Sequence, residues 1–524
     1  MNGRLFDRIQ VRYSLIMKTK STFRIGRYLA APCMLAASVG AQPNILLITA
    51  DDLGWDSLGV HGCPVAETTP NLDRLAQEGS RFEHAYVSIA LCTPSRQAML
   101  SGNYSHQTMT HGFTELERKG PAMPDLLKQH GYYLANINKQ ADYYEWDTAI
   151  GEDASAMGRD VPFYYTAISD IIAQAAKKQQ PWFIMANSND PHRPFYNSES
   201  ELKNPKYTAF REAKRLSTPS RVYSPDEISV PGFLPDLPEI RQDMAEYYSS
   251  VRRLDDSVGR ILAAVEDAGQ TTNTLVIFMS DNGISVPYSK MNCYRASLRT
   301  PMILRWPGRI PANYRDPRNM VSGVDLAPTL FEFAGIDIPP HMAGRSFAPL
   351  LAGKSQPDRD YIVGHHYRNL RSNQMYPEFT IQSLDWVYIY NPWVDGKTEV
   401  HNSDYTGSTT LLAMWDAAEK IPSVRERVNF HKYRVIQELY NVRQDPYAYH
   451  NVIDNPENAE QAALMRQKLL TWMKDTDHPA AKLMADPLNP TLIAEYMALE
   501  KATATEEDAE LDELNKQMRE KTKK

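Results

Sequence analysis

The fold of this chain is decided by the stretch NILLITADD at residues 44–52. Its apolar side chains follow one another without alternation, which predicts a strand buried on both faces, as in a parallel sheet. Residues 181–186 and 275–279 show the same pattern. Helical patterns alternate with these strands, at residues 71–77 and 240–268. We therefore expect an α/β fold in which a large mixed, mostly parallel sheet is sandwiched by helices.

Polar side chains follow each of these three strands directly. They are Asp51 and Asp52 after the first strand, the stretch DPHR at residues 190–193 after the second, and Asp281 with Asn282 after the third. Open α/β sheets bind ligands at the carboxyl ends of their strands. The sequence therefore predicts that these side chains share one site.

The pattern changes after residue 353. Short runs at residues 361–363, 379–381 and 386–390 predict antiparallel strands, and residues 459–474 predict a helix. We interpret residues 42–353 as a catalytic domain and residues 354–485 as a smaller α/β subdomain built on a short antiparallel sheet. Residues 486–524 are interpreted as a charged tail, helical or flexible.

The first 41 residues are typical of an export signal. Arg24 and Arg27 precede an apolar run at residues 28–41, which ends in the small residues Val39-Gly40-Ala41. The run is too short to span a bilayer. The alternative is a short buried helix. The export interpretation predicts a periplasmic or secreted protein with no membrane span.

Composition excludes one class of partner. The 524 residues are 42% hydrophobic and 23% charged, with a formal net charge of −7. This is an ordinary globular composition, and the bulk charge gives no sign of nucleic-acid binding. An anionic substrate must be held by local basic residues.

The cysteines divide into three groups. Cys33 lies in the predicted signal, and Cys92 lies in a motif considered below. Cys63 and Cys293 remain, and the sequence leaves open whether they pair.

The two acidic pairs predict a metal site. Adjacent carboxylates such as Asp51 and Asp52 repel each other, which favours a bound cation, and Asp281 with Asn282 offers two more oxygen ligands. Oxygen donors without a His or Cys pair at zinc spacing favour a hard ion such as Ca²⁺. The alternative is that each pair caps a loop.

Cys92 carries the most specific motif. It stands in LCTPSR at residues 91–96, with proline two positions on and arginine four positions on. This stretch resembles the type I sulfatases, in which a maturation enzyme converts the cysteine to formylglycine. A helix is predicted over residues 94–100, and a helix N-terminus at Cys92 favours an anion.

The resemblance covers nearly the whole mature chain, up to the stretch ELY at residues 438–440 and Asp445-Pro446. It implies an alkaline-phosphatase-like fold and hydrolysis of sulfate esters or sulfamates. It also implies a Ca²⁺ ion ligated at the positions of Asp51, Asp52, Asp281 and Asn282, with the formylglycine at Cys92 completing the pocket.

The resemblance implies roles for further residues. Arg96 would hold the formylglycine hydrate, Lys139 and Lys290 would bind sulfate, and His192 would protonate the leaving group. The pair His365-His366 and Arg371 lie where the C-terminal part of the family approaches the pocket, which predicts substrate contacts.

One position departs from the family pattern, which is usually Gly-Lys-x-His around the lysine. Here Ala141 stands in place of the histidine. The resemblance leaves open whether another group, such as His111, takes over its role in proton transfer.

The substrate is predicted to be a sulfated carbohydrate. DPHR, VPGFLPD at residues 230–236 and SDNGI at residues 280–284 resemble the N-sulfoglucosamine sulfohydrolases, which remove N-linked sulfate from heparan-type sugars. Relatives of this branch include O-sulfatases of algal polysaccharides of the ulvan or carrageenan type, and that alternative stays open. Sparse basic residues favour an exo-type pocket. Two further alternatives are a phosphodiesterase of the same superfamily and a non-catalytic sulfated-glycan-binding protein.

Overall fold

The central strand of the fold is β1 (Asn44–Asp51), in which every residue is buried. A computed structural model describes residues 42–112, 120–139, 144–151, 158–369, 374–402 and 405–522. Its strands include an eight-stranded sheet in the order β4-β3-β5-β1-β6-β7-β2-β8. The other strands of this sheet are β2 (Ser80–Tyr86), β3 (Tyr133–Ile137), β4 (Thr148–Ile150), β5 (Trp182–Pro191), β6 (Thr274–Ser280), β7 (Met302–Arg305) and β8 (Tyr314–Ser322).

The sheet is mixed and mostly parallel, which confirms the predicted fold class. Both neighbours of β1, the strands β5 and β6, run parallel to it. Only β7 runs antiparallel to its neighbours among the described strands of this sheet. The carboxyl ends of β5, β1 and β6 therefore lie side by side at one edge.

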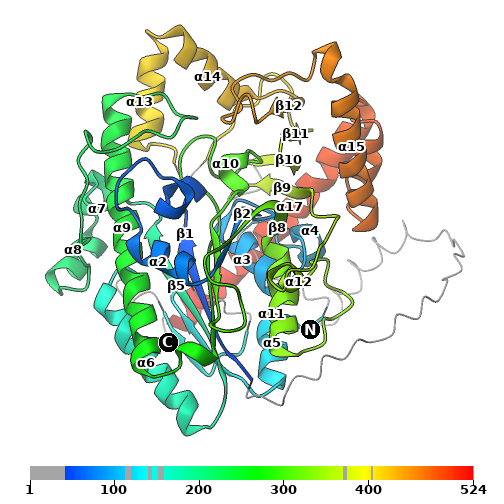
Figure 1. Cartoon of the computed structure of the whole chain (residues 1–524). Helices are drawn as coiled ribbons and strands as arrows, with labels where there is room; N and C mark the ends of the chain where they lie inside the picture. Colours follow the sequence, from blue (N-terminus) through cyan, green and yellow to red (C-terminus); the bar gives the residue numbers. More distant parts are fainter. Residues whose placement is uncertain are drawn as a thin grey trace, which may run out of the picture. The chain divides into compact units, whose positions relative to one another are not determined.

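Side chains of β1 alternate between two cores, one on each face of the sheet. Leu46 and Ile48 pack in the core formed with α2 (Pro70–Glu78), α6 (Val161–Lys177) and α9 (Pro238–Asp267). Ile45 and Leu47 pack in the core on the other face. The helices there are α3 (Cys92–Ser101), α5 (Met123–Gln129) and α11 (Leu326–Ala334). Figure 1 shows these helices on either side of β1 and β5. A strand covered on both faces must be apolar along its whole length, as predicted.

A second, antiparallel sheet is built from the C-terminal half of the chain, in the order β12-β11-β10-β9. Its strands are β9 (Tyr361–Arg368), β10 (Met375–Ser383), β11 (Trp386–Tyr390) and β12 (Gln437–Asn441). A third core joins this sheet to α15 (Ala459–Asp475), α16 (Ala481–Ala485) and α17 (Pro490–Thr522). Arg368 of β9 donates hydrogen bonds to the carbonyl of Ala504 and to the carboxylate of Glu507, which holds α17 against the sheet.

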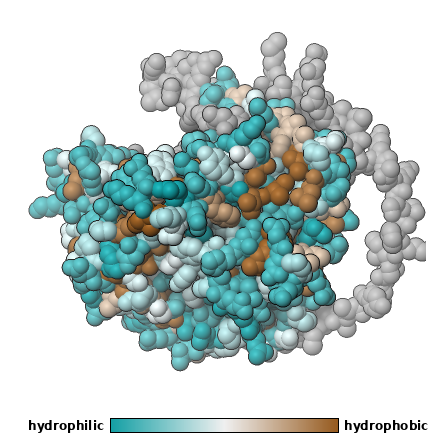
Figure 2. All heavy atoms as spheres, turned by 90° about the horizontal axis from the view of Figure 1, so that it is seen from above, coloured by the Kyte–Doolittle hydropathy of each residue, from teal (hydrophilic) through white to brown (hydrophobic). Residues whose placement is uncertain are grey.

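The remaining described α-helices are short or lie at the periphery: α4 (Ser105–Thr108), α7 (Glu199–Lys203), α8 (Pro205–Glu212), α10 (Arg295–Leu298), α12 (Ala348–Leu351), α13 (Thr409–Ala418) and α14 (Pro422–Tyr433). None of the helices in the described ranges has the length and apolar character needed to cross a bilayer. The face in Figure 2 is largely hydrophilic, with separate hydrophobic patches. The exposed large apolar residues include Leu412 and Trp415 of α13.

Candidate active site

Three adjacent strands and one helix end deliver the side chains of the site. Asp51 and Asp52 lie at the end of β1, His192 follows β5, and Asp281 with Asn282 follows β6. The structure brings them together as the strand pattern predicts. Asp52 donates its backbone N–H to Asp281 Oδ1 at 3.1 Å, and Asn282 Nδ2 donates to Asp52 Oδ1 at 2.7 Å.

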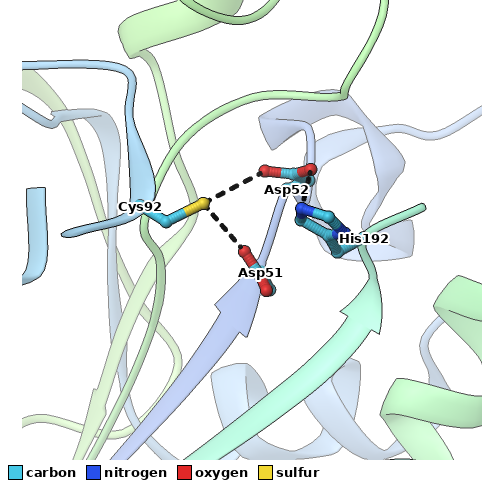
Figure 3. Close-up of side chains that lie close together, drawn as sticks. All are labelled: Asp51, Asp52, Cys92 and His192. Carbon is cyan, nitrogen blue, oxygen red and sulfur yellow. Dashed lines mark hydrogen bonds and ion pairs between the residues drawn. The ribbon is translucent and has the colours of Figure 1, made fainter. Parts of the chain in front are cut away.

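Cys92 is the first residue of α3 and faces the aspartate pair (Figure 3). Its Sγ lies 3.3 Å from Asp51 Oδ1 and 4.0 Å from Asp52 Oδ1. Burial, followed by the charge of Asp51, raises the pKa of the thiol well above its ordinary value. An unmodified Cys92 is therefore a neutral thiol and a poor nucleophile, because the thiolate is the reactive form.

Each of the three carboxylates is paired with its own cation. Lys139 Nζ lies 2.6 Å from Asp51 Oδ2, Lys290 Nζ lies 2.7 Å from Asp52 Oδ1, and Arg96 Nη2 lies 2.7 Å from Asp281 Oδ2. Lys290 Nζ is also 3.6 Å from Cys92 Sγ. These three ion pairs balance in formal charge, so net attraction for an anion at the site must come from a further positive group.

The cations set the ionisation of the buried carboxylates. Burial raises the pKa of Asp51, but the positive charges of Lys139, His192, Arg96 and Lys290 outweigh burial and hold this pKa well below its usual value. Burial raises the pKa of Asp281 to about 7, against the opposing charge of Arg96. Asp281 is thus less well compensated than Asp51, and an additional cation would favour its charged form.

The backbone of the site is strained at non-glycine residues. Asp52, Asn138 and Lys139 have φ of 67°, 55° and 42°, in the left-handed region. Asn138 is held there because its Nδ2 donates to Tyr164 Oη at 3.1 Å and to the carbonyl of Asn187 at 3.2 Å. Such strain persists only where surrounding contacts over-determine it, which is typical of functional sites.

His192 faces Asp52 from the side opposite Cys92 (Figure 3). Its Nε2 lies 3.7 Å from Asp52 Oδ2, and its side chain is 31% exposed. Its Nδ1 bonds to the carbonyl oxygen of Arg193 at 2.5 Å, so Nδ1 carries a proton and Nε2 is directed toward the carboxylates. This partial exposure places the ring between the buried charges and solvent.

Two arginines that sequence reasoning missed hold the loop of His192 in place by hydrogen bonds. Arg253 of α9 donates to both oxygens of Asp190, at 2.7 and 3.0 Å. Arg159 donates from Nη2 to the carbonyl of His192 at 2.6 Å. Both arginines are almost completely buried. The sequence carries no signal for a buried arginine, because arginine is usually exposed.

Sequence reasoning also missed Asn187 of β5. It is fully buried, and its Oδ1 accepts hydrogen bonds from Arg96 Nη1 at 2.7 Å and from Thr49 Oγ1 at 2.5 Å. These contacts fix the guanidinium that faces Asp281. An asparagine inside an apolar strand is the signal that could have revealed this role.

The oxygen donors of the site suit a hard divalent cation. Ligand atoms of Asp51, Asp52, Cys92 and His192 all lie within 4.8 Å of one another. Asn282 Oδ1 is buried and has no hydrogen-bond partner among the described residues. A buried acceptor without a partner is costly, whereas a carbonyl-type oxygen is a good Ca²⁺ ligand.

The structure places His365 and His366 in the interior. The ring of His365 lies among Tyr104, His106 and Trp472, and neither ring nitrogen has a hydrogen-bond partner in the described ranges. His366 Nε2 bonds to Asn369 Oδ1 at 3.1 Å. Both histidines are fully buried. Their predicted substrate contacts remain a prediction.

Two positions raised by the sequence, Arg371 and Ala141, lie outside the described residues. His111 stacks on Tyr367 with ring centroids 4.0 Å apart, and burial lowers its pKa to about 3. Cys63 and Cys293 are both free thiols in the part of the chain that the structure describes.

Comparison with known proteins agrees with this geometry. The profile described as Sulfatase matches residues 43–336, which is more than half of the chain. The chain belongs to the sulfatase family. It is therefore a hydrolase of sulfate esters or sulfamates. A second profile, the C-terminal part of N-sulphoglucosamine sulphohydrolase, matches residues 286–395.

Individual relatives cover most of the sulfatase chain. The human N-sulphoglucosamine sulphohydrolase is 28% identical over 492 residues, which are 86% of this chain and 94% of the relative. An ulvan-active sulfatase of Formosa agariphila is 24% identical, over 84% of this chain and 77% of the relative. A solved protein in complex with its substrate D-glucosamine-2-N,6-O-disulfate has a TM-score of 0.62 at 21% identity, over 84% of this chain and 99% of that protein. That likeness shows a shared fold.

His365 gives the sulfatase a testable dependence of stability on pH. Burial, followed by the charges of neighbouring histidines, lowers the pKa of His365 well below 6.5. Below pH 6.5 the unfolded chain binds a proton that the folded chain excludes, so this residue destabilises the fold as the pH falls. We therefore compare the free energy of unfolding of His365→Phe with that of wild type. We expect this difference to change in favour of the variant by up to about 2 kcal/mol as the pH falls from 7 to 5.

Urea denaturation at both pH values, at constant calcium concentration, measures this difference. His450→Gln is the control, because His450 is exposed. We expect this variant to change the free energy of unfolding by the same amount at both pH values. A constant difference between His365→Phe and wild type across this range would contradict the prediction.

Proposed function

We propose that this sulfatase is an exported enzyme that removes sulfate from a sulfated carbohydrate, with a formylglycine made from Cys92 and with Ca²⁺. The observation that carries the proposal is the position of Cys92. It begins α3 and faces the buried aspartate pair, and the ammonium of Lys290 lies 3.6 Å from its sulfur. A neutral buried thiol has no evident use there, whereas an oxygen nucleophile at the same position would face the cations that an attacking and a leaving anion require.

Asp51, Asp52, Asp281 and Asn282, together with the modified residue at Cys92, would hold the calcium ion. The buried, partnerless oxygen of Asn282 and the high pKa of Asp281 support this ligand set. When bound, Ca²⁺ supplies the excess positive charge that the balanced ion pairs lack. We infer that His192 lies at the rim of this ligand set.

The remaining residues have roles that follow from their positions. The formylglycine supplies, as its hydrate, the hydroxyl that attacks sulfur. Arg96 is held by Asn187 and Asp281 and orients the residue at position 92. Lys139 and Lys290 bind sulfate oxygens from two sides. His192 is the partly exposed group and donates the proton that the leaving sugar oxygen or nitrogen takes up.

The carbohydrate substrate is supported by the relatives. The profile match to the C-terminal part of N-sulphoglucosamine sulphohydrolase favours an N-sulfated glucosamine. The exo-type pocket expected from the sequence would take this unit from the end of a chain. The relatives described as ulvan-active sulfatases support the alternative, in which the substrate is an O-sulfated algal sugar. The Arg-rich apolar leader at residues 24–41 supports export to the periplasm or beyond, where polysaccharide is available.

The first test concerns Cys92. After co-expression with a formylglycine-generating enzyme, we expect mass spectrometry of the Cys92 peptide to show an aldehyde in place of the thiol. Cys92→Ala should lose at least about 10³-fold in turnover while keeping its fold, because the nucleophile is absent. Cys63→Ala is the matched control and should keep full activity, since Cys63 is a partly buried free thiol to which the proposal assigns no role. An active Cys92→Ala protein would exclude this nucleophile.

The second test concerns the metal. Asp281→Asn removes one carboxylate charge, so we expect calcium affinity measured by titration calorimetry to fall at least about tenfold. The calcium-induced increase in Tm should shrink in parallel. The matched control is Asp255→Asn, another buried aspartate, which instead accepts the N–H groups of Asn71 and Leu72 at the start of α2. Equal calcium binding by wild type and Asp281→Asn would remove Asp281 from the ligand set.

The third test identifies the substrate. Sulfate release is measured by ion chromatography on N-sulfated glucosamine, on O-sulfated glucosamine and on sulfated ulvan and carrageenan oligosaccharides. We expect the N-sulfated sugar to be preferred by at least about tenfold in kcat/KM, with desulfation starting at the chain end. Preference for an algal oligosaccharide would select the alternative substrate. Binding without any release by the formylglycine form would indicate a glycan-binding protein.

A further inference from the structure

Lys290 lies in an irregular segment between β6 and α10, and the backbone around it is strained. Tyr288 and Met291, which flank Lys290, have φ of 69° and 56°. Both are non-glycine residues in the left-handed region, which persists only when surrounding contacts enforce it. Met291 N–H donates to the carbonyl of Ala90, which ties one side of the segment to the approach to Cys92.

The small antiparallel sheet forms hydrogen bonds to the other side of the segment that carries Lys290. Glu378 of β10 accepts the backbone N–H of Cys293 at 3.1 Å, and Gln382 donates to the carbonyl of Cys293 at 3.0 Å. The hydroxyl of Tyr294 donates to Glu438 Oε2 of β12 at 2.9 Å. These three hydrogen bonds connect the sheet from the C-terminal half to Cys293 and Tyr294, shortly after Lys290 in the sequence.

The connection continues inside the segment to Lys290 itself. Tyr294 N–H donates to Asn292 Oδ1 at 3.1 Å, and Asn292 Nδ2 donates to the carbonyl of Lys290 at 2.8 Å. The chain of hydrogen bonds therefore runs from Glu438 through Tyr294 and Asn292 to the backbone that carries the ammonium facing Asp52.

Glu438, at which this series of hydrogen bonds begins, is held rigidly. It is fully buried, and its Oε1 accepts from Arg434 Nη2 and from Asn391 Nδ2, each at 2.7 Å. The same arginine pairs with Glu378 at 2.9 Å. Arg434 has φ of 51°, so its backbone is also held in the left-handed region. A buried carboxyl group with its hydrogen bonds filled in this way is fixed in position, because any displacement leaves buried polar groups unpaired.

We propose that Glu438, acting through Tyr294, is a positioning residue that sets where the Lys290 ammonium stands opposite Cys92 and Asp52. The inference rests on the proposed function, in which Lys290 binds a sulfate oxygen. It also assigns a role to the stretch ELY at residues 438–440, which does not itself lie in the active site. The carboxylate of Glu438 connects the second sheet to the reacting centre.

Substitution of two tyrosines that bind Glu438 can distinguish this positioning role from a role in packing alone. Tyr440 also donates to Glu438 Oε2, at 2.7 Å, and is as deeply buried as Tyr294. Tyr440 lies on β12 beside Glu438, whereas Tyr294 belongs to the segment that carries Lys290. Tyr294→Phe and Tyr440→Phe therefore each remove one hydroxyl from the same carboxylate oxygen, and only the first removes a hydrogen bond between Glu438 and the segment that carries Lys290.

The experiment compares these two variants in the full-length, formylglycine-containing enzyme. Both should lower Tm similarly, by about 1–2 °C, since each loses one buried hydrogen bond. We expect Tyr294→Phe to lower kcat roughly tenfold because the ammonium is displaced, and Tyr440→Phe to keep kcat within about twofold. In a Lys290→Ala background the Tyr294→Phe change should have no further effect on kcat, because residues acting through one group are not additive.

A binding measurement keeps this inference separate from the identity of the substrate. Calorimetric titration with inorganic sulfate needs no sugar, and we expect about threefold weaker binding for Tyr294→Phe and unchanged binding for Tyr440→Phe. A wild type that binds sulfate but releases none from any sugar would overturn the proposed function and not this inference. Equal losses in both tyrosine variants, or additive effects with Lys290→Ala, would show that Glu438 serves packing alone.

Discussion

Everything in this site depends on the mutual repulsion of carboxylates that two adjacent parallel strands, β1 and β6, bring to one edge of a sheet. Asp51, Asp52 and Asp281 are fully buried, and buried like charges at this spacing cannot all ionise without compensation. Lys139 and Lys290 supply part of that compensation. The ion pairs only balance the carboxylates. In the function proposed above, a bound cation adds the positive charge that attracts the sulfate anion, which connects the fold to metal binding.

The compensating cations come from parts of the chain that have no regular structure. Lys139 follows β3 in a left-handed conformation, and Lys290 stands between two left-handed residues. Strained loops of this kind need rigid support. The second sheet provides it for Lys290 through Glu378 and Glu438, and the buried pair of Arg253 with Asp190 provides it for the loop of His192. The small sheet therefore supports the site through the backbone of the segment that carries Lys290.

The sequence predicted the elements well where burial leaves a simple pattern. The strands β1 and β6 and the helix α9 agree with the apolar runs and the helical spacing. β5 extends to Pro191, beyond the predicted residue 186, because Asn187 and Asp190 remain in the sheet edge with their polar groups satisfied by Arg96 and Arg253. An apolar pattern cannot show such residues, since their partners come from distant parts of the chain.

The sequence by itself determined the family, the order of strands and helices, and the carboxylates that meet at the strand ends. Local patterns suffice for these, because a strand buried on both faces must be apolar and because parallel strands end at one edge. Only the tertiary structure decided which cation pairs with which carboxylate and how Lys290 is supported. Those features depend on contacts such as Tyr294 with Glu438, which are 144 residues apart. Ion pairs and buried hydrogen bonds are set by distance in space, which the spacing of residues along a chain does not record.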